Sequence, residues 1–129
     1  MTDEWNDRGV KQGAEYAILT DEISKAWSNM TTRQYKKFKN LKKENLRDNM
    51  STLELVLNML AEATTTEISK EQKPVTFEEN KAVARSGGEV AGIARLEAEK
   101  RTGKPVITSK NTADNNQLVA NMIEDSETK

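Results

Sequence analysis

The sequence predicts an all-α protein, a small helical bundle of five to seven helices that is expected to be oligomeric. Three segments match the capping-box pattern, in which a Ser or Thr is followed three residues later by Glu or Gln at the start of a helix. They lie at residues 31–34, 51–54 and 76–79. Apolar residues then recur every three or four positions, the period of an amphipathic helix. Residues 106–109 could be extended, but a single short segment cannot form a sheet.

We expect three regions along the chain. Residues 1–17 are polar and contain Gly9 and Gly13, so they predict a flexible N-terminal arm. Residues 18–124 form the helical domain, and residues 125–129 form a short acidic tail. A length of 129 residues is ordinary for a single domain.

The first convincing helix is predicted to begin near Thr20, a suitable N-cap. Asp21 and Glu22 then lie in its first turn, where the helix dipole favours acidic side chains. Its apolar positions have helical spacing: Leu19, Ile23, Ala26, Trp27 and Met30. The next helix begins at Thr31 and continues through Met50, as one helix or as a short pair.

Ser51 opens the best-defined helix, which we expect to be the most buried element because its apolar spacing persists for about four turns. The positions concerned are Leu53, Val56, Leu57, Leu60, Ala61, Thr64 and Ile68. Another helix begins at Thr76 and is predicted to break or kink at Gly87-Gly88. A helix over 90–102 then ends at Gly103, a suitable C-cap. A last amphipathic helix is predicted around Leu118, Val119, Met122 and Ile123.

The composition indicates a thin core beneath a charged surface. Hydrophobic residues make up 35% of the chain and charged residues 32%. We therefore expect part of the helical surface to be buried by another copy of the chain, which predicts a homo-oligomer. There is no apolar run long enough for a membrane span, and the polar start is unlike a signal peptide, so a cytoplasmic location is expected.

The chain has no histidine and no cysteine. The commonest general base and the commonest transition-metal ligand are therefore missing, as are thiolate zinc sites, disulfides and cysteine nucleophiles. The glutamates are not spaced as in metal-binding bundles, which use Glu-x-x-His. We expect a non-enzymatic protein with no catalytic residues, no metal and no cofactor.

A long ordered series of residues resembles one known family. It runs through 41–50, Leu53-Glu54, Leu60 and 62–68, then Phe77, Glu79-Asn80-Lys81 and 87–92, and closes with Ala94-Arg95, Glu97, Glu99, Thr102-Gly103-Lys104, Val106, Ser109 and Asn111. This series resembles the C-terminal helical half of the DNA-damage-inducible protein D (DinD) family, over roughly residues 16–112.

The resemblance implies an association with the DNA-damage response and with phages or other mobile elements. The family is linked to interference with recombinase on single-stranded DNA. Its full-length members also carry a BRO-type N-terminal domain connected with DNA binding. This sequence lacks that domain, so the resemblance implies either a fragment or a reduced stand-alone member.

The clearest charge feature is a basic block over residues 31–50, which contains only two acidic residues, Glu44 and Asp48. Its cationic members are Arg33, Lys36, Lys37, Lys39, Lys42, Lys43 and Arg47. Such a block can neutralise phosphates along a nucleic-acid backbone. The alternative is a solvated helix face that docks an acidic helix of a partner. Tyr35 and Phe38, within the block, could stack on bases or belong to the core.

A second set of residues is a candidate pocket for an anion or a small ligand. It comprises Arg47, Thr64, Thr65, Thr66, Gly87, Gly88 and Arg95. A glycine-rich helix start offers free N–H groups to an anion, and arginines add charge. The alternative is structural: threonines end or pack a helix, and glycines let two helices approach closely.

Three functions are compatible with these features. The first is a DinD-like regulator that binds single-stranded DNA, DNA–recombinase complexes or a host protein. The second is a small-molecule sponge that sequesters a nucleotide signal in counter-defence. The third is an oligomerisation module of a larger protein.

Overall fold

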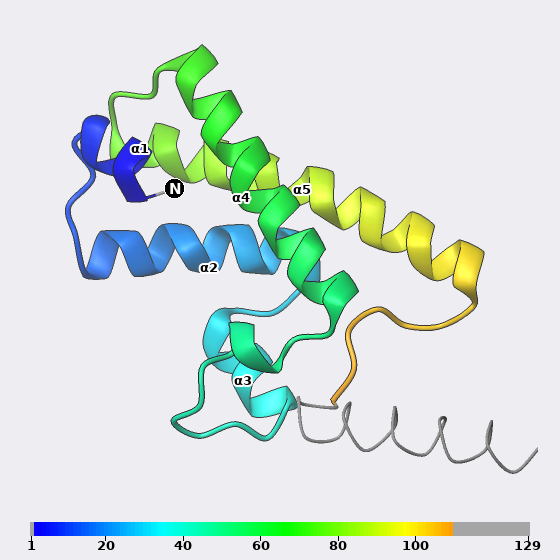
Figure 1. The fold of residues 1–129 in the computed structure, drawn as a ribbon. Helices are drawn as coiled ribbons and strands as arrows, with labels where there is room; N and C mark the ends of the chain where they lie inside the picture. The colour runs from blue at the N-terminus through cyan, green and yellow to red at the C-terminus, as the bar shows by residue number, and fades with distance from the viewer. Residues whose placement is uncertain (1, 110–129) are drawn as a thin grey trace, which may run out of the picture.

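The computed structural model describes residues 2–109 and is helical (Figure 1). Five α-helices and one short 3-10 helix, η1, follow in the order α1 (Thr2–Asp7), α2 (Ala14–Ser28), α3 (Thr32–Phe38), η1 (Arg47–Asn49), α4 (Thr52–Gln72) and α5 (Phe77–Thr102). No strand occurs within these residues, so the all-α prediction is confirmed for this part of the chain. The helix predicted around Leu118 and the acidic tail at 125–129 lie outside the described residues.

Helix α5 is the centre of the bundle, because it packs extensively against both α4 and α2. In Figure 1 α4 lies across α2 and α5, and α3 and η1 lie together at one side of the bundle. The largest fully buried apolar side chains are Trp27 and Leu19 of α2 and Tyr35 of α3. The core therefore depends on α2 more than the apolar spacing of α4 led us to expect.

Two of the three predicted capping boxes form in full. The Thr31 hydroxyl accepts a hydrogen bond from the Gln34 backbone amide, and Ser51 does the same for Glu54, each with the reciprocal bond from the N-cap amide. Thr76 also caps α5, but the Glu79 carboxylate accepts from the amide of Val75 instead of that of Thr76. These helix starts are local features, which is why the sequence locates them well.

The polar N-terminal segment is a packed part of the fold, so the prediction of a flexible arm over residues 1–17 is wrong. Trp5 of α1 is 3% exposed and lies against the Tyr16 ring, with the ring centroids 5.3 Å apart. Glu4 accepts a hydrogen bond from Ser69 of α4 (2.8 Å). Helix α2 consequently begins at Ala14 rather than near Thr20, because its first turns hold the side chains that cover α1.

Helix α5 runs without a break through Gly87-Gly88, so the predicted break or kink is wrong. The two glycines lie where helices cross. A Cβ on Gly87 would be 2.7 Å from the backbone nitrogen of Thr65, and one on Gly88 would be 2.6 Å from the Ile23 carbonyl oxygen. The alternative interpretation, close helix approach through small residues, is confirmed.

Helix α3 ends earlier than predicted. Asn40 adopts a left-handed conformation with φ of 60°, and the Leu41 amide donates to the Lys36 carbonyl oxygen. This is the hydrogen bond of a Schellman motif, which stops a helix and turns the chain. A non-helical connection then leads to η1, so the prediction of one continuous helix is wrong. The structure has two short helical pieces instead, and the second ends at Asn49.

Helix α4 buries a face shifted by about one residue from the predicted stripe, and the two have Leu57 and Ala61 in common. Its buried residues are Glu54, Leu57, Ala61, Thr65 and Ser69. Leu53, Val56 and Leu60 from the predicted apolar stripe are exposed. The prediction failed because polar residues that find partners inside the fold occupy core positions, and an apolar pattern cannot reveal them.

Candidate functional site

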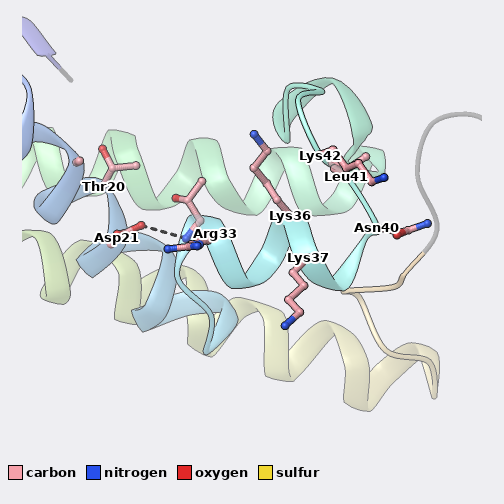
Figure 2. A pocket seen from close by; sticks show the side chains of 10 residues that line it. Thr20, Asp21, Arg33, Lys36, Lys37, Asn40, Leu41 and Lys42 are labelled. Atoms are coloured by element: carbon pink, nitrogen blue, oxygen red, sulfur yellow. Dashed lines mark hydrogen bonds between the residues drawn. The ribbon is translucent and has the colours of Figure 1, made fainter.

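Four cationic residues of the basic block line one hollow at the surface, which we call the basic hollow. They are Arg33, Lys36, Lys37 and Lys42 (Figure 2). The remaining lining comes from Ala17, Thr20, Asp21, Thr32, Asn40 and Leu41, and the volume is about 760 Å³. Arg33, Lys37 and Lys42 are exposed, and Lys36 is half-buried.

The local fold explains why these charges lie together. Arg33 has Lys36 and Lys37 as its neighbours three and four residues further along α3. The side chains of Lys36 and Lys37 extend to opposite sides of this helix in Figure 2. The turn at Asn40 then reverses the chain and places Lys42 at the end of the same hollow. The first turns of α2 supply the opposite wall through Ala17 and Thr20.

Asp21 is the acidic residue of the lining, and its carboxylate is already engaged. It accepts a hydrogen bond from the Thr32 backbone amide at 3.0 Å, drawn as a dashed line in Figure 2. Thr32 is the first residue of α3, so the bond satisfies an N-terminal amide and fixes α3 against α2. The four cations therefore outnumber the single acid, and the hollow favours an anionic ligand.

Lys39 does not belong to this surface, so its assignment as a nucleic-acid contact is wrong. Its side chain is fully buried, and its ammonium group donates to the Glu54 carboxylate (3.0 Å) and to the Thr108 carbonyl oxygen (2.9 Å). A buried lysine requires such partners, and Glu54 is fully buried as well.

Tyr35 completes this buried network. Its hydroxyl donates to the second carboxylate oxygen of Glu54. Burial raises the pKa of Tyr35 above its usual range, and the neighbouring Glu54 carboxylate adds to the effect. Of the two aromatic residues in the block, Tyr35 is a core residue, whereas Phe38 is 47% exposed and does not line the basic hollow.

The remaining cations of the block lie outside the basic hollow. Lys43 is exposed in the connection after α3. Arg47 donates to both carboxylate oxygens of Glu62, at 2.9 Å each. Within the connection, Glu44 accepts from the Lys42 backbone amide (2.7 Å), and this bond holds the pKa of Glu44 below its usual range. Glu44 thus stabilises the turn that presents Lys42.

The predicted small-ligand pocket is not assembled. Gly87 packs directly on Thr65, which leaves no space between them, and both glycines lie inside a helix rather than at its N-terminus. The hydroxyls of Thr65 and Thr66 donate to carbonyl oxygens one turn earlier, and Thr64 is half-buried on the same helix. Arg95 donates to the Trp27 carbonyl oxygen (3.1 Å) and pairs with Glu99. These residues stabilise helix packing.

A second hollow of about 540 Å³ adjoins the first, and sequence reasoning missed it. The two share Thr20, Thr32 and Lys36 in their linings. Its apolar lining comes from Trp5, Ile23, Leu46 and Met50, and polar groups include Ser24, Asn45, Arg47, Asn58 and Glu62. We call this second hollow the adjoining hollow. It was not predicted because Trp5, which lines it, belongs to the segment predicted as a flexible arm.

Within residues 2–109, no three acidic side chains gather in a way that could hold a metal ion. None of the helices in this part of the chain is long and apolar enough to cross a membrane. Comparison of the chain with family models, with curated proteins and with solved structures finds no match.

Proposed function

We propose that this chain is a non-enzymatic, DinD-like regulatory protein that binds the phosphate backbone of single-stranded DNA in the basic hollow. The supporting observation is that Arg33, Lys36, Lys37 and Lys42 line one hollow whose acidic residue already holds α3 in place. In this proposal the protein originates from a phage or mobile element. It acts in the cytoplasm, as a homo-oligomer, on DNA–recombinase complexes or on a host protein.

The physical basis is local charge, because the whole chain carries a formal net charge of only −1. Cations that neutralise phosphates release the counterions condensed on the nucleic acid, and this release contributes most at low salt. A hollow with several cations on low-dielectric walls also concentrates the electrostatic field. Binding is therefore expected to be independent of base sequence and strongly salt-dependent.

The test is a salt titration of binding to a fluorescently labelled single-stranded oligonucleotide. The double variant Lys37→Ala/Lys42→Ala removes two exposed cations of the basic hollow. It should weaken binding to every sequence tested and reduce the slope of log K against log salt by about 1.4, roughly 0.7 for each lost phosphate contact.

The matched control is Lys11→Ala/Lys70→Ala, which removes the same charge at exposed positions outside the basic hollow. It should leave the slope within error of the unmodified protein. Lys43→Ala separates the hollow from the block as a whole, because Lys43 belongs to the block but not to the lining. Equal losses for each charge removed, in all three variants, would show that binding depends on overall charge and would overturn the proposed site.

The adjoining hollow favours a second candidate function, the sequestration of a small nucleotide. It offers an apolar lining for a base and Lys36 for a phosphate, and Arg47 would exchange its pairing with Glu62 for the phosphate. A ligand that binds only the folded state raises the melting temperature. A panel of cyclic nucleotides in a thermal-shift assay should therefore show stabilisation that Arg47→Ala reduces, whereas Arg95→Ala should lower stability with and without ligand alike.

A further inference from the structure

The outer face of α5 carries a stripe of four residues, Glu89, Ile93, Leu96 and Lys100, which we call the α5 stripe. Ile93 is 70% exposed and Leu96 is 62% exposed. Their spacing of four, three and four residues places them along one line of the helix. The buried residues of α5, among them Gly87 and Ala91, face α4 and α2 on the other side. Two large aliphatic side chains are therefore presented to solvent between an acid and a base.

The order of residues in the α5 stripe is self-complementary. If a second α5 lies antiparallel to the first, with the two-fold axis between residues 94 and 95, Ile93 meets the partner's Leu96. Glu89 then meets the partner's Lys100. A parallel arrangement in the same register would instead place Glu89 beside Glu89 and Lys100 beside Lys100. We infer that the chain forms an antiparallel, two-fold symmetric homodimer through the α5 stripe.

The charges at the two ends of the stripe are available for such contacts. Among the described residues, neither Glu89 nor Lys100 forms an ion pair, whereas their neighbours on α5 are engaged, Arg95 with Glu99 and Arg101 with Glu97. The unpaired acid and base are eleven residues apart, and the proposed register brings each opposite its counterpart on the second copy.

A shallow depression beside the α5 stripe can receive a side chain of the second copy. Glu89, Ile93 and Leu96 line a shallow hollow of about 340 Å³ together with Ala26, Trp27, Asn29, Gly92 and Arg95. Most of this lining lies where α2 ends against α5. An aliphatic side chain of the second copy can enter the hollow and remove its own surface and that of the hollow from water.

The interface is expected to be modest. A single pair of crossing helices buries less than the roughly 1,200 Å² typical of a stable specific complex. Association should therefore depend on protein concentration, and analytical ultracentrifugation from about 1 µM to about 1 mM should show a monomer–dimer equilibrium. A monomer across this whole range would overturn the inference.

Two sets of variants test the surface and the register. Ile93→Ser/Leu96→Ser should weaken dimerisation at least about tenfold. The control Met59→Ser/Val75→Ser removes equally exposed apolar groups elsewhere and should leave the equilibrium unchanged. Glu89→Lys and Lys100→Glu should each weaken the dimer, and the double exchange Glu89→Lys/Lys100→Glu should restore it. Failure of the double exchange to restore the dimer would overturn the antiparallel register.

Disulfide trapping gives an independent readout, because the natural chain contains no cysteine. When separately tagged Ile93→Cys and Leu96→Cys chains are mixed and oxidised, the mixed disulfide should form faster than either like-with-like disulfide. Preferential like-with-like bonding would indicate a parallel pair and overturn the inference. These experiments use no nucleic acid, so the dimer can fail while the basic hollow still binds DNA, and the reverse also holds.

Discussion

The side chain of Lys39 belongs to a run of surface lysines in the sequence and to the core in the structure. Its ammonium group, the Glu54 carboxylate and the Tyr35 hydroxyl form one buried network, and the Thr108 carbonyl oxygen takes a further hydrogen bond from Lys39. Glu54 also closes the capping box of α4 by accepting from the Ser51 amide (3.2 Å). One carboxylate therefore connects the start of α4 to α3 and, through Lys39, to the segment after α5.

Replacing Lys39 should consequently affect stability rather than binding. Lys39→Ala leaves the Glu54 carboxylate buried without its cation, and breaking a buried pair in this way costs about 3–5 kcal/mol. The matched control Lys43→Ala should change the free energy of unfolding by less than about 0.5 kcal/mol, because Lys43 is exposed. Urea denaturation measures both. Equal stability of the two variants would contradict the buried network.

Gly87 and Gly88, like Lys39, have a role that only their tertiary contacts explain. Glycine inside a helix costs about 1 kcal/mol relative to alanine, so two in succession indicate either a break or a tertiary requirement. The backbone nitrogen of Thr65 and the carbonyl oxygen of Ile23 occupy the positions that Cβ atoms would need. The requirement is tertiary, and α5 remains continuous.

At the scale of elements, the segment after α5 is held by Glu99. Its carboxylate accepts from the Val106 backbone amide (2.9 Å) and pairs with Arg95. Val106 and Ile107 are buried against the bundle. The hydrogen bond from Val106, with that from Arg95, holds the pKa of Glu99 below its usual range despite the opposing effect of burial.

This contact predicts a pH dependence. Because the pKa of Glu99 is lowered in the folded state, the unfolded chain binds the proton more readily. The contribution of Glu99 to stability is thus present above its ordinary pKa of 4.5 and is lost as the pH falls through the lower folded value. The melting temperature of Glu99→Gln should therefore decline less between pH 6 and pH 3, roughly the range over which a shifted glutamate titrates, than that of the unmodified protein.

The control for this prediction is Glu97→Gln, which removes an acid from an exposed pair with Arg101 on the same helix. Exposed pairs of this kind contribute little, so its pH profile should follow that of the unmodified protein. Amide exchange at Val106 should also increase in Glu99→Gln. Identical pH profiles for Glu99→Gln and the unmodified protein would show that the carboxylate does not anchor the segment.

At the scale of the whole molecule, both ends of the described chain close the bundle. Trp5 contacts Tyr16 of α2, and Glu4 reaches Ser69 of α4, so α1 covers one side. Burial raises the pKa of Glu4, but hydrogen bonds from Arg8 and Ser69 outweigh it, and the net pKa is lowered. With only 35% hydrophobic residues, the fold depends on such contacts to complete its core.

Truncating the indole should therefore destabilise the whole molecule. Trp5→Ala is expected to lower the free energy of unfolding by about 3–5 kcal/mol, the usual cost of removing a large buried aromatic side chain. Ile18→Ala, at an exposed position, is the control and should cost well under about 1 kcal/mol. If residues 1–17 were a flexible arm, Trp5→Ala and Ile18→Ala would have the same free energy of unfolding. Chemical denaturation therefore distinguishes a flexible arm from a packed N-terminal segment.

The sequence by itself determined the helical class and the helix starts at Thr31, Ser51 and Thr76, because periodicity and capping depend on residues within one or two turns. It also identified the basic block, from which Arg33, Lys36, Lys37 and Lys42 form the basic hollow.

Only the tertiary structure decided which members of each pattern face solvent. Lys39 is buried because Glu54 lies opposite it, and Gly87-Gly88 continue a helix because Thr65 and Ile23 approach them. Trp5 is part of the core because α2 extends to meet it. Each of these outcomes depends on residues between 11 and 65 positions away in the chain, and burial is set by such distant partners. A local pattern does not contain that information.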